Sequence, residues 1–226
     1  MLKSPYDYKA LSRKTDSKTG VRFYATPDKE KLPSVTTILS KTKPKEDLEG
    51  LRKWRERVGE SKAREITKEA GNVGTLMHQR LEWFVQDIEK PVGGNMIHQQ
   101  ANNMSQVIIE NGLKHMDEFW GTEVSLWYPG LYAGSTDLIG TWKGKPAIID
   151  FKQSNRLKKD EYIDSYKQQL CAYAMAHNEV YGTNIETGVV LICTRALEYQ
   201  EFVIEGDEFE KWSDKWISSV EAYYKL

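Results

Sequence analysis

The stretch Pro146–Ser154, "PAIIDFKQS", decides the fold, because it reads as a strand from the interior of a sheet. It carries an acid and a base, Asp150 and Lys152, two residues apart. Successive side chains of a strand point to opposite faces, so these two share one face while Phe151 points to the other. Burying a charge is unfavourable unless it is paired or binds a metal. The pattern therefore predicts a counter-charge, a metal ion or a substrate beside this face.

A second acid is expected close to Asp150. Asp137 lies in "AGSTDLIG" on the preceding strand, and a turn at Lys143-Gly144 joins the two strands. Counting about six residues back from the turn and six forward brings the two carboxylates nearly opposite each other. Carboxylates this close repel each other unless a divalent cation lies between them. The residues alone leave an alternative open, a purely structural Asp150–Lys152 ion pair with a surface Asp137.

The hydrophobic periodicity predicts strands and helices in a mixed arrangement. An antiparallel meander is expected, with turns at Pro129-Gly130 and Lys143-Gly144. Its strands cover residues 122–129, 131–144 and 145–153, and two further strands cover 187–194 and 199–206. Helices are expected over 45–71 (broken at Gly59 and ended at Gly71), 72–88, 94–120, 159–182 and 207–224. The last has a core-facing stripe of Phe209, Trp212, Trp216 and Val220.

Before these elements, a strand or hairpin arm from Gly20 should turn at Pro27-Asp28 and lead to a short helix capped by Ser34. Strands placed between helices predict an α/β fold with a mixed β-sheet flanked by α-helices and a helical amino-terminal portion. We expect one domain over residues 1–226, with an amino-terminal strand and helical portion over 1–71 and a core over 72–226.

Composition narrows the class of protein. The 226 residues are 39% hydrophobic and 29% charged, enough for one sizeable core or for a core with a small appended lobe. The net charge of −1 excludes a polycation that coats nucleic acid, and two cysteines are too few for a zinc or iron–sulfur site. No apolar run approaches about 20 residues, and no signal core follows the start. We expect no membrane or targeting segment, and a complete chain from the cytoplasm of a bacterium or of a phage-infected host.

Two helices carry polar pairs at a spacing of four residues. His78 and Glu82 share a helix face, as do Gln169 and Tyr173 on the helix that follows the Asp150 strand. That helix must pack back on the sheet, so its amide and phenol are expected near Lys152 or a substrate. A lone helical histidine is more often a packing or surface residue than a ligand. The spacing alone is compatible with either role for His78.

Four motifs in order carry a resemblance to a known family. "GTLMH" (74–78), "AGSTD" (133–137), "IIDFK" (148–152) and "QLCAY" (169–173) resemble the motifs of the PD-(D/E)XK nuclease superfamily in its RecB-like exonuclease branch. The segments 32–43 and 51–78 look like the amino-terminal half of the mitochondrial genome maintenance exonucleases and their bacteriophage relatives. The similarity extends over nearly the whole chain.

The resemblance implies a fold, a site and a reaction. The fold would be restriction-endonuclease-like, and the reaction metal-dependent exonucleolytic cleavage of DNA, with a preference for single strands and free ends. Mg²⁺ or Mn²⁺ would be bound by His78, Asp137, Asp150 and the carbonyl of Phe151. Lys152 would be the catalytic lysine, supported by Gln169 and Tyr173. Glu123 matches an acid found one strand earlier in such nucleases, although an edge charge on a strand explains it equally well.

DNA would be held by cations and aromatic rings, since single strands bind through phosphate contacts and base stacking. The candidates are Arg156, Lys158 and Lys159 in the loop after the catalytic strand, with Trp54 and Trp83. The expected roles are phage DNA degradation, recombination or replication, with a recombinase or single-strand-binding protein as a partner. The alternatives are a structure-specific endonuclease and a catalytically silent DNA-binding recombination protein.

Overall fold

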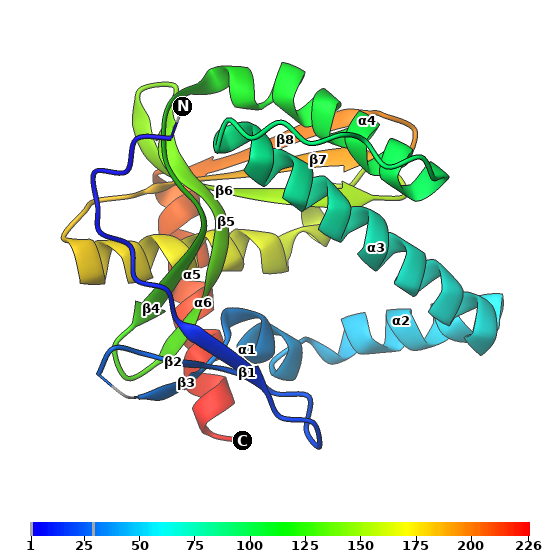
Figure 1. The fold of residues 1–226 in the computed structure, drawn as a ribbon. Helices are drawn as coiled ribbons and strands as arrows, with labels where there is room; N and C mark the ends of the chain where they lie inside the picture. Colours follow the sequence, from blue (N-terminus) through cyan, green and yellow to red (C-terminus); the bar gives the residue numbers. More distant parts are fainter. Residues whose placement is uncertain (1, 29) are drawn as a thin grey trace.

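A computed structural model describes residues 2–28 and 30–226, and its centre is a five-stranded sheet (Figure 1). The strands, in spatial order, are β4 (Met116–Tyr128), β5 (Tyr132–Trp142), β6 (Lys145–Ser154), β7 (Thr187–Thr194) and β8 (Tyr199–Glu205). Only β6 and β7 run parallel, and the other neighbours are antiparallel. The predicted α/β class with a mixed sheet is confirmed, as is the meander from β4 to β6.

Helices cover both faces of this sheet. Leu138 and Ile149 pack with helices α3 (Glu60–Val85) and α4 (Met96–Asn111). The next residues in the same strands, Ile139 and Ile148, point the other way and pack with α5 (Asp164–Tyr181) and α6 (Asp207–Tyr224). Short 3₁₀ turns occupy Leu113–His115 and Asp160–Tyr162. The predicted stripe of α6, Phe209, Trp212, Trp216 and Val220, is buried.

The β5–β6 hairpin forms as the sequence predicts. Lys143 and Gly144 have φ angles of 48° and 80°, the left-handed pair that closes a two-residue type I′ turn. The pairing runs from Trp142–Lys145 to Leu138–Ile149, and there it ends. Asp137 and Asp150 are the next residues in line, at the point where β5 and β6 stop pairing with each other.

The amino-terminal part forms a second, smaller sheet (Figure 1). It consists of the antiparallel strands β1 (Ser12–Thr15), β2 (Arg22–Ala25) and β3 (Lys31–Pro33), followed by α1 (Val35–Lys41) and α2 (Lys45–Val58). The predicted cap of α1 is confirmed, because Ser34 Oγ accepts the Thr37 N–H at 3.0 Å. A bridge between Ser34 and Ala133 joins the small sheet to β5.

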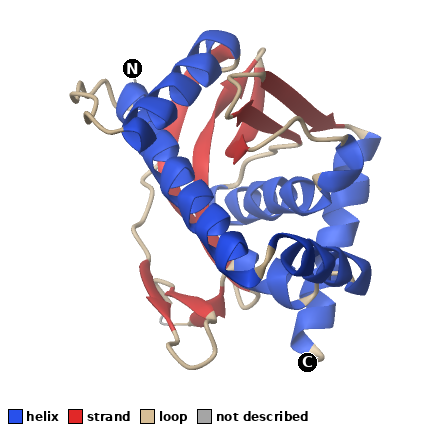
Figure 2. Cartoon of the chain, turned by 90° about the vertical axis from the view of Figure 1, so that its right-hand side faces the viewer, coloured by secondary structure: helices blue, strands red, loops and turns tan. Residues whose placement is uncertain are grey.

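One predicted helix boundary is wrong in the first half of the chain. The break at Gly59, with φ of 83°, is confirmed, but α3 continues through Gly71. It is the long unbroken helix in the foreground of Figure 2. Val73, Met77, Leu81 and Val85 form one buried row along α3. This burial outweighs the cost of about 1 kcal/mol for each glycine inside a helix.

A second boundary is wrong after α4, which ends at Asn111 instead of reaching Trp120. Residues 116–120 belong to β4 and pair with β5. Gly112 lies too close to its surroundings for a larger residue, since a Cβ there would be 2.7 Å from Leu191 Cδ1.

Among the described residues, no helix is both long and apolar enough to cross a lipid bilayer.

Candidate active site

His78 is brought to the sheet by the close approach of α3 to β6. A Cβ at Gly74, one turn earlier, would be 3.3 Å from Gln153 Cγ, so a glycine lets the helix lie against the strand. The His78 ring meets the Phe151 ring edge-on at 6.0 Å. Its Nδ1 lies 3.4 Å from Asp137 Oδ1. The two predicted residues therefore meet, although they are 59 positions apart in the sequence.

Asp137 links the two strands where their pairing ends. Its Oδ2 accepts the Phe151 backbone N–H at 2.7 Å, and its Oδ1 faces His78. Burial raises the pKa of Asp137, but His78, Lys152 and the Phe151 N–H together hold it below the usual value. For His78, burial lowers the pKa, and the Asp137 carboxylate more than compensates. The pair thus favours an ionised carboxylate next to a readily charged imidazole.

Asp150 and Lys152 form a buried ion pair beside this link. Asp150 is 1% exposed; its Oδ2 lies 2.5 Å from Lys152 Nζ, and its Oδ1 accepts Gln169 Nε2–H at 3.1 Å. Burial raises the pKa of Asp150 to about 6 even though Lys152 opposes the change. For Lys152, burial lowers the pKa, and Asp150 and Asp137 raise it by more. The ammonium also lies 4.9 Å from the centre of the Tyr166 ring.

Glu123 joins the site from β4 in an uncommon backbone conformation. Its φ is 51°, and it stands opposite Asp137, because Thr122 pairs with Leu138 and Val124 with Thr136. Left-handed backbone is rare for residues other than glycine and is concentrated at functional sites. Burial and the nearby Asp137 carboxylate raise the pKa of Glu123. The strained residue thus places a second carboxylate against the first.

His78, Glu123 and Asp137 are the group that fits a metal ion. Each offers one ligand atom, and the three atoms lie within 4.8 Å of one another. Two carboxylates suit Mg²⁺ or Mn²⁺, and an imidazole also suits other divalent transition metals. The two acids repel each other at close range, which a cation between them would relieve. The donor set therefore matches the divalent metal expected from the sequence.

The metal ligands expected from the sequence overlap with this group only in part. Asp150 lies nearby, but its oxygens are turned to Lys152 and Gln169. Phe151 reaches Asp137 with its N–H. Both stay predictions as ligands. Glu123 was expected from the resemblance alone, and counting seven residues back and seven forward from Gly130 also places it opposite Asp137.

His78, Glu123 and Asp137 line a cleft of about 570 Å³. Gln169 and Tyr173 line it from α5, as the sequence predicted, and Gly134 leaves room for Tyr173, because a Cβ there would be 2.7 Å from the ring. The small amino-terminal sheet also lines the cleft. It contributes Arg13, Arg22 and Tyr24, which no sequence motif indicated.

Comparison with known proteins identifies relatives of one kind. The chain is 27% identical over 204 residues to mitochondrial genome maintenance exonuclease 1 of Mus musculus, and 25% identical over 205 residues to that of Homo sapiens. The matches cover 85% of this chain and 59% and 58% of the relatives, so the chain spans less than two thirds of their length. The resemblance seen in the motifs is confirmed.

Solved structures add distant likenesses. A candidate exonuclease from Eubacterium rectale has a TM-score of 0.48 and 16% identity, covering 68% of this chain and 65% of that chain. An alkaline exonuclease from Laribacter hongkongensis has a TM-score of 0.32 and 16% identity, covering 60% and 73%. No family model matches the chain.

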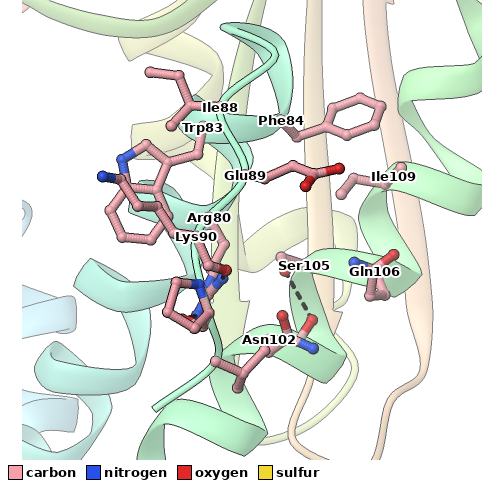
Figure 3. A pocket seen from close by; sticks show the side chains of 12 residues that line it. Arg80, Trp83, Phe84, Ile88, Glu89, Lys90, Asn102, Ser105, Gln106 and Ile109 are labelled. Atoms are coloured by element: carbon pink, nitrogen blue, oxygen red, sulfur yellow. Dashed lines mark hydrogen bonds between the residues drawn. The ribbon is translucent and has the colours of Figure 1, made fainter.

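The residues predicted to hold DNA lie outside this cleft. Trp83 packs 5.2 Å from Arg80 in a separate groove between α3 and α4 (Figure 3). Trp54 is half-buried on α2. In the loop after β6, Arg156 is exposed, the Lys158 backbone bonds to Gln200, and Lys159 lies 3.7 Å from Glu161. The roles of these five residues in DNA binding stay predictions.

Proposed function

We propose that the chain is a metal-dependent nuclease that hydrolyses phosphodiester bonds of DNA, acting as an exonuclease on single strands or free ends. One observation carries the proposal: His78, Glu123 and Asp137 converge in an open cleft, with the buried Asp150–Lys152 pair beside them. Perturbed charged groups in a cleft are typical of active sites. The names of the relatives, all exonucleases, support it.

In this proposal each residue has a distinct role. A divalent cation held by His78, Glu123 and Asp137 would act as a Lewis acid on the phosphate and lower the pKa of a bound water. The Phe151 N–H keeps the Asp137 carboxylate in place.

The lysine acts from the other side of the site. Asp150 keeps Lys152 charged, and Gln169 in turn holds Asp150. Lys152 is thereby a fixed positive group, which stabilises negative charge as it develops on the phosphate. Because its ion pair exists before substrate binds, little reorganisation is needed at the moment of reaction.

The preference for single strands in this proposal comes from the resemblance of the motifs. The cleft, of about 570 Å³, lies within the range of roughly 300–1,000 Å³ that is typical of ligand pockets. Phage DNA degradation, recombination or replication, a bacterial host cytoplasm and a recombinase or single-strand-binding partner remain predictions from the sequence.

The test uses labelled DNA of defined form. Linear single-stranded, linear double-stranded and circular single-stranded DNA are incubated with Mg²⁺ or Mn²⁺, and the products are sized. The proposal predicts that linear single strands are shortened from an end, that circles stay intact, and that Asp137→Asn abolishes cleavage. Circles that are opened to linear strands would mean that the protein is an endonuclease and not an exonuclease. Intact DNA in every form, with both metals, would overturn the nuclease function.

A further inference from the structure

The β1–β2 hairpin presents two arginines on one face. Arg13 pairs with Tyr24, and Thr15 pairs with Arg22. Because paired residues and residues two apart in a strand point to the same face, all four side chains lie on one face of the hairpin. Arg13, Arg22 and Tyr24 all line the cleft that contains Asp137. Lys14 lies between them in sequence but points to the other face.

The position of Arg22 is fixed by its backbone. Its N–H donates to Thr37 Oγ1 at 3.1 Å, and its carbonyl accepts the Ser34 N–H at 2.9 Å. Ser34 also bridges to Ala133 on β5, the strand that carries Asp137. Tyr24, Leu32, Trp127 and Ala133 bury together and hold the two sheets in contact. The face that carries the arginines is therefore held in place against the main sheet.

Both guanidinium groups lack a carboxylate partner. Within residues 2–28 and 30–226, neither forms an ion pair at 4.0 Å or less, although Glu82, Glu123 and Asp137 line the same cleft. Other arginines of the chain do pair with acids, as Arg52 does with Glu49 and Arg195 with Glu69. Two arginines without an acidic partner thus line the same cleft as the acidic group.

The charge of the cleft fits an anion between its walls. Three carboxylates and two guanidinium groups give a formal charge of −1, and a divalent cation among the carboxylates would change this to +1. A guanidinium matches the oxygens of a phosphate with two parallel N–H donors. A strand crossing the cleft would then meet the acidic group on one side and the arginines on the other.

We propose that Arg13 and Arg22 bind phosphate groups of the DNA strand that flank the cleaved one, and so hold the strand across the cleft. This inference rests on the proposed nuclease function and names the residues that position its substrate. Both act by contact with the DNA backbone, so their effect falls on substrate affinity and not on the bond-breaking step.

The experiment compares Arg13→Ala, Arg22→Ala and the double variant with Lys14→Ala, which removes a cation from the opposite face of the same hairpin. Steady-state cleavage of a short single-stranded oligonucleotide in Mg²⁺ gives KM and kcat. We expect KM to rise about tenfold for each arginine, since hydrogen bonds to charged groups have this size, with kcat within about twofold. Lys14→Ala should match the wild type.

A second readout reports phosphate contacts directly. Oligonucleotide binding is measured in the Lys152→Ala background at several salt concentrations, and each lost arginine should flatten the plot of log affinity against log salt by about 0.7. Thermal melts verify folding, and Arg13→Gln and Arg22→Gln replace any alanine variant that fails to fold. An unchanged KM and slope in the double variant, or an equal loss in Lys14→Ala, would overturn the inference. DNA left intact by the wild type would instead defeat the proposed function.

Discussion

Two helical histidines, His78 and His177, look alike in sequence and lie in opposite environments. His78 faces the cleft and has the Asp137 carboxylate at 3.4 Å. His177, on α5, is fully buried among the rings of Tyr6, Tyr8 and Tyr181. Burial lowers the pKa of both; the acid reverses this for His78, while nothing does for His177, whose pKa falls to about 4.

The hydrogen bonds of His177 define its neutral form. Thr183 donates its O–H to Asn178 Oδ1 at 2.7 Å, so the Thr183 oxygen accepts from His177 Nδ1–H at 2.7 Å. Nε2 is then the acceptor for the Tyr8 hydroxyl at 3.0 Å. His177 is thus a satisfied core residue. The difference teaches that the partner, and not the residue type or its helical spacing, separates a candidate ligand from a packing residue.

The largest effect on activity is expected in the region around His78. Lys152→Ala should lower kcat by about 1,000-fold, because in the proposed function it removes the positive charge that stabilises the developing charge on the phosphate. The matched control is Lys167→Ala, another buried lysine, which pairs with Asp160 and Glu208 away from the cleft. It should lose stability and keep kcat. Equal losses of kcat in both folded variants would remove the distinction between the two regions.

In the region around His177, the histidine should make the free energy of unfolding depend on pH. Its pKa is depressed to about 4 in the fold, against about 6.5 when unfolded, so its contribution is complete above pH 6.5 and is lost as the pH falls toward 4. The loss amounts to about 3 kcal/mol of unfolding free energy. Denaturant titrations at pH 7 and pH 4 should show a smaller loss for His177→Gln than for the wild type. Equal losses would mean that His177 is not held neutral.

His78→Ala should weaken the use of metal. We expect cleavage at low Mg²⁺ or Mn²⁺ to fall by about 100-fold, and raised metal to restore part of it, because one of three ligands is gone. His177→Gln serves as the control and should keep the metal dependence of the wild type. Metal dependence unchanged by His78→Ala would contradict a ligand role for this imidazole.

A smaller effect is expected at Tyr8. Tyr8→Phe removes the hydroxyl that donates to His177 Nε2 and should lower the unfolding free energy by about 1 kcal/mol, with cleavage unaffected. Chemical denaturation and the cleavage assay measure the two quantities. A change in cleavage would show that the tyrosine rings around His177 and the cleft are coupled.

Much of the fold and part of the site could be read from local sequence signals. The Lys143-Gly144 turn fixes the register of its hairpin, which is why Asp137 and Asp150 could be placed together. The spacing of Gln169 and Tyr173 likewise placed both on the cleft-facing side of α5. These signals are local, since each depends on a turn type or a helix period.

The rest depends on tertiary packing that no local pattern contains. Gly71 resembles a helix end, and only the burial of Val73 and Met77 shows that α3 continues. Glu123 stands opposite Asp137 by register, but its left-handed backbone in β4 is not indicated by any local pattern. Arg13 and Arg22 reach the cleft because a separate small sheet folds against β5, over 100 residues away in sequence.

The central claim, that His78, Glu123 and Asp137 hold a divalent cation, is tested most directly by calorimetric titration of the protein with Mn²⁺. Wild type, Glu123→Gln and Asp137→Asn are compared with Asp47→Asn, which removes an exposed carboxylate on α2. We predict one site in the wild type, affinity lowered at least about tenfold in the first two variants, and no change in the third. No Mn²⁺ binding by the wild type, or equal affinity in all four proteins, would contradict the account.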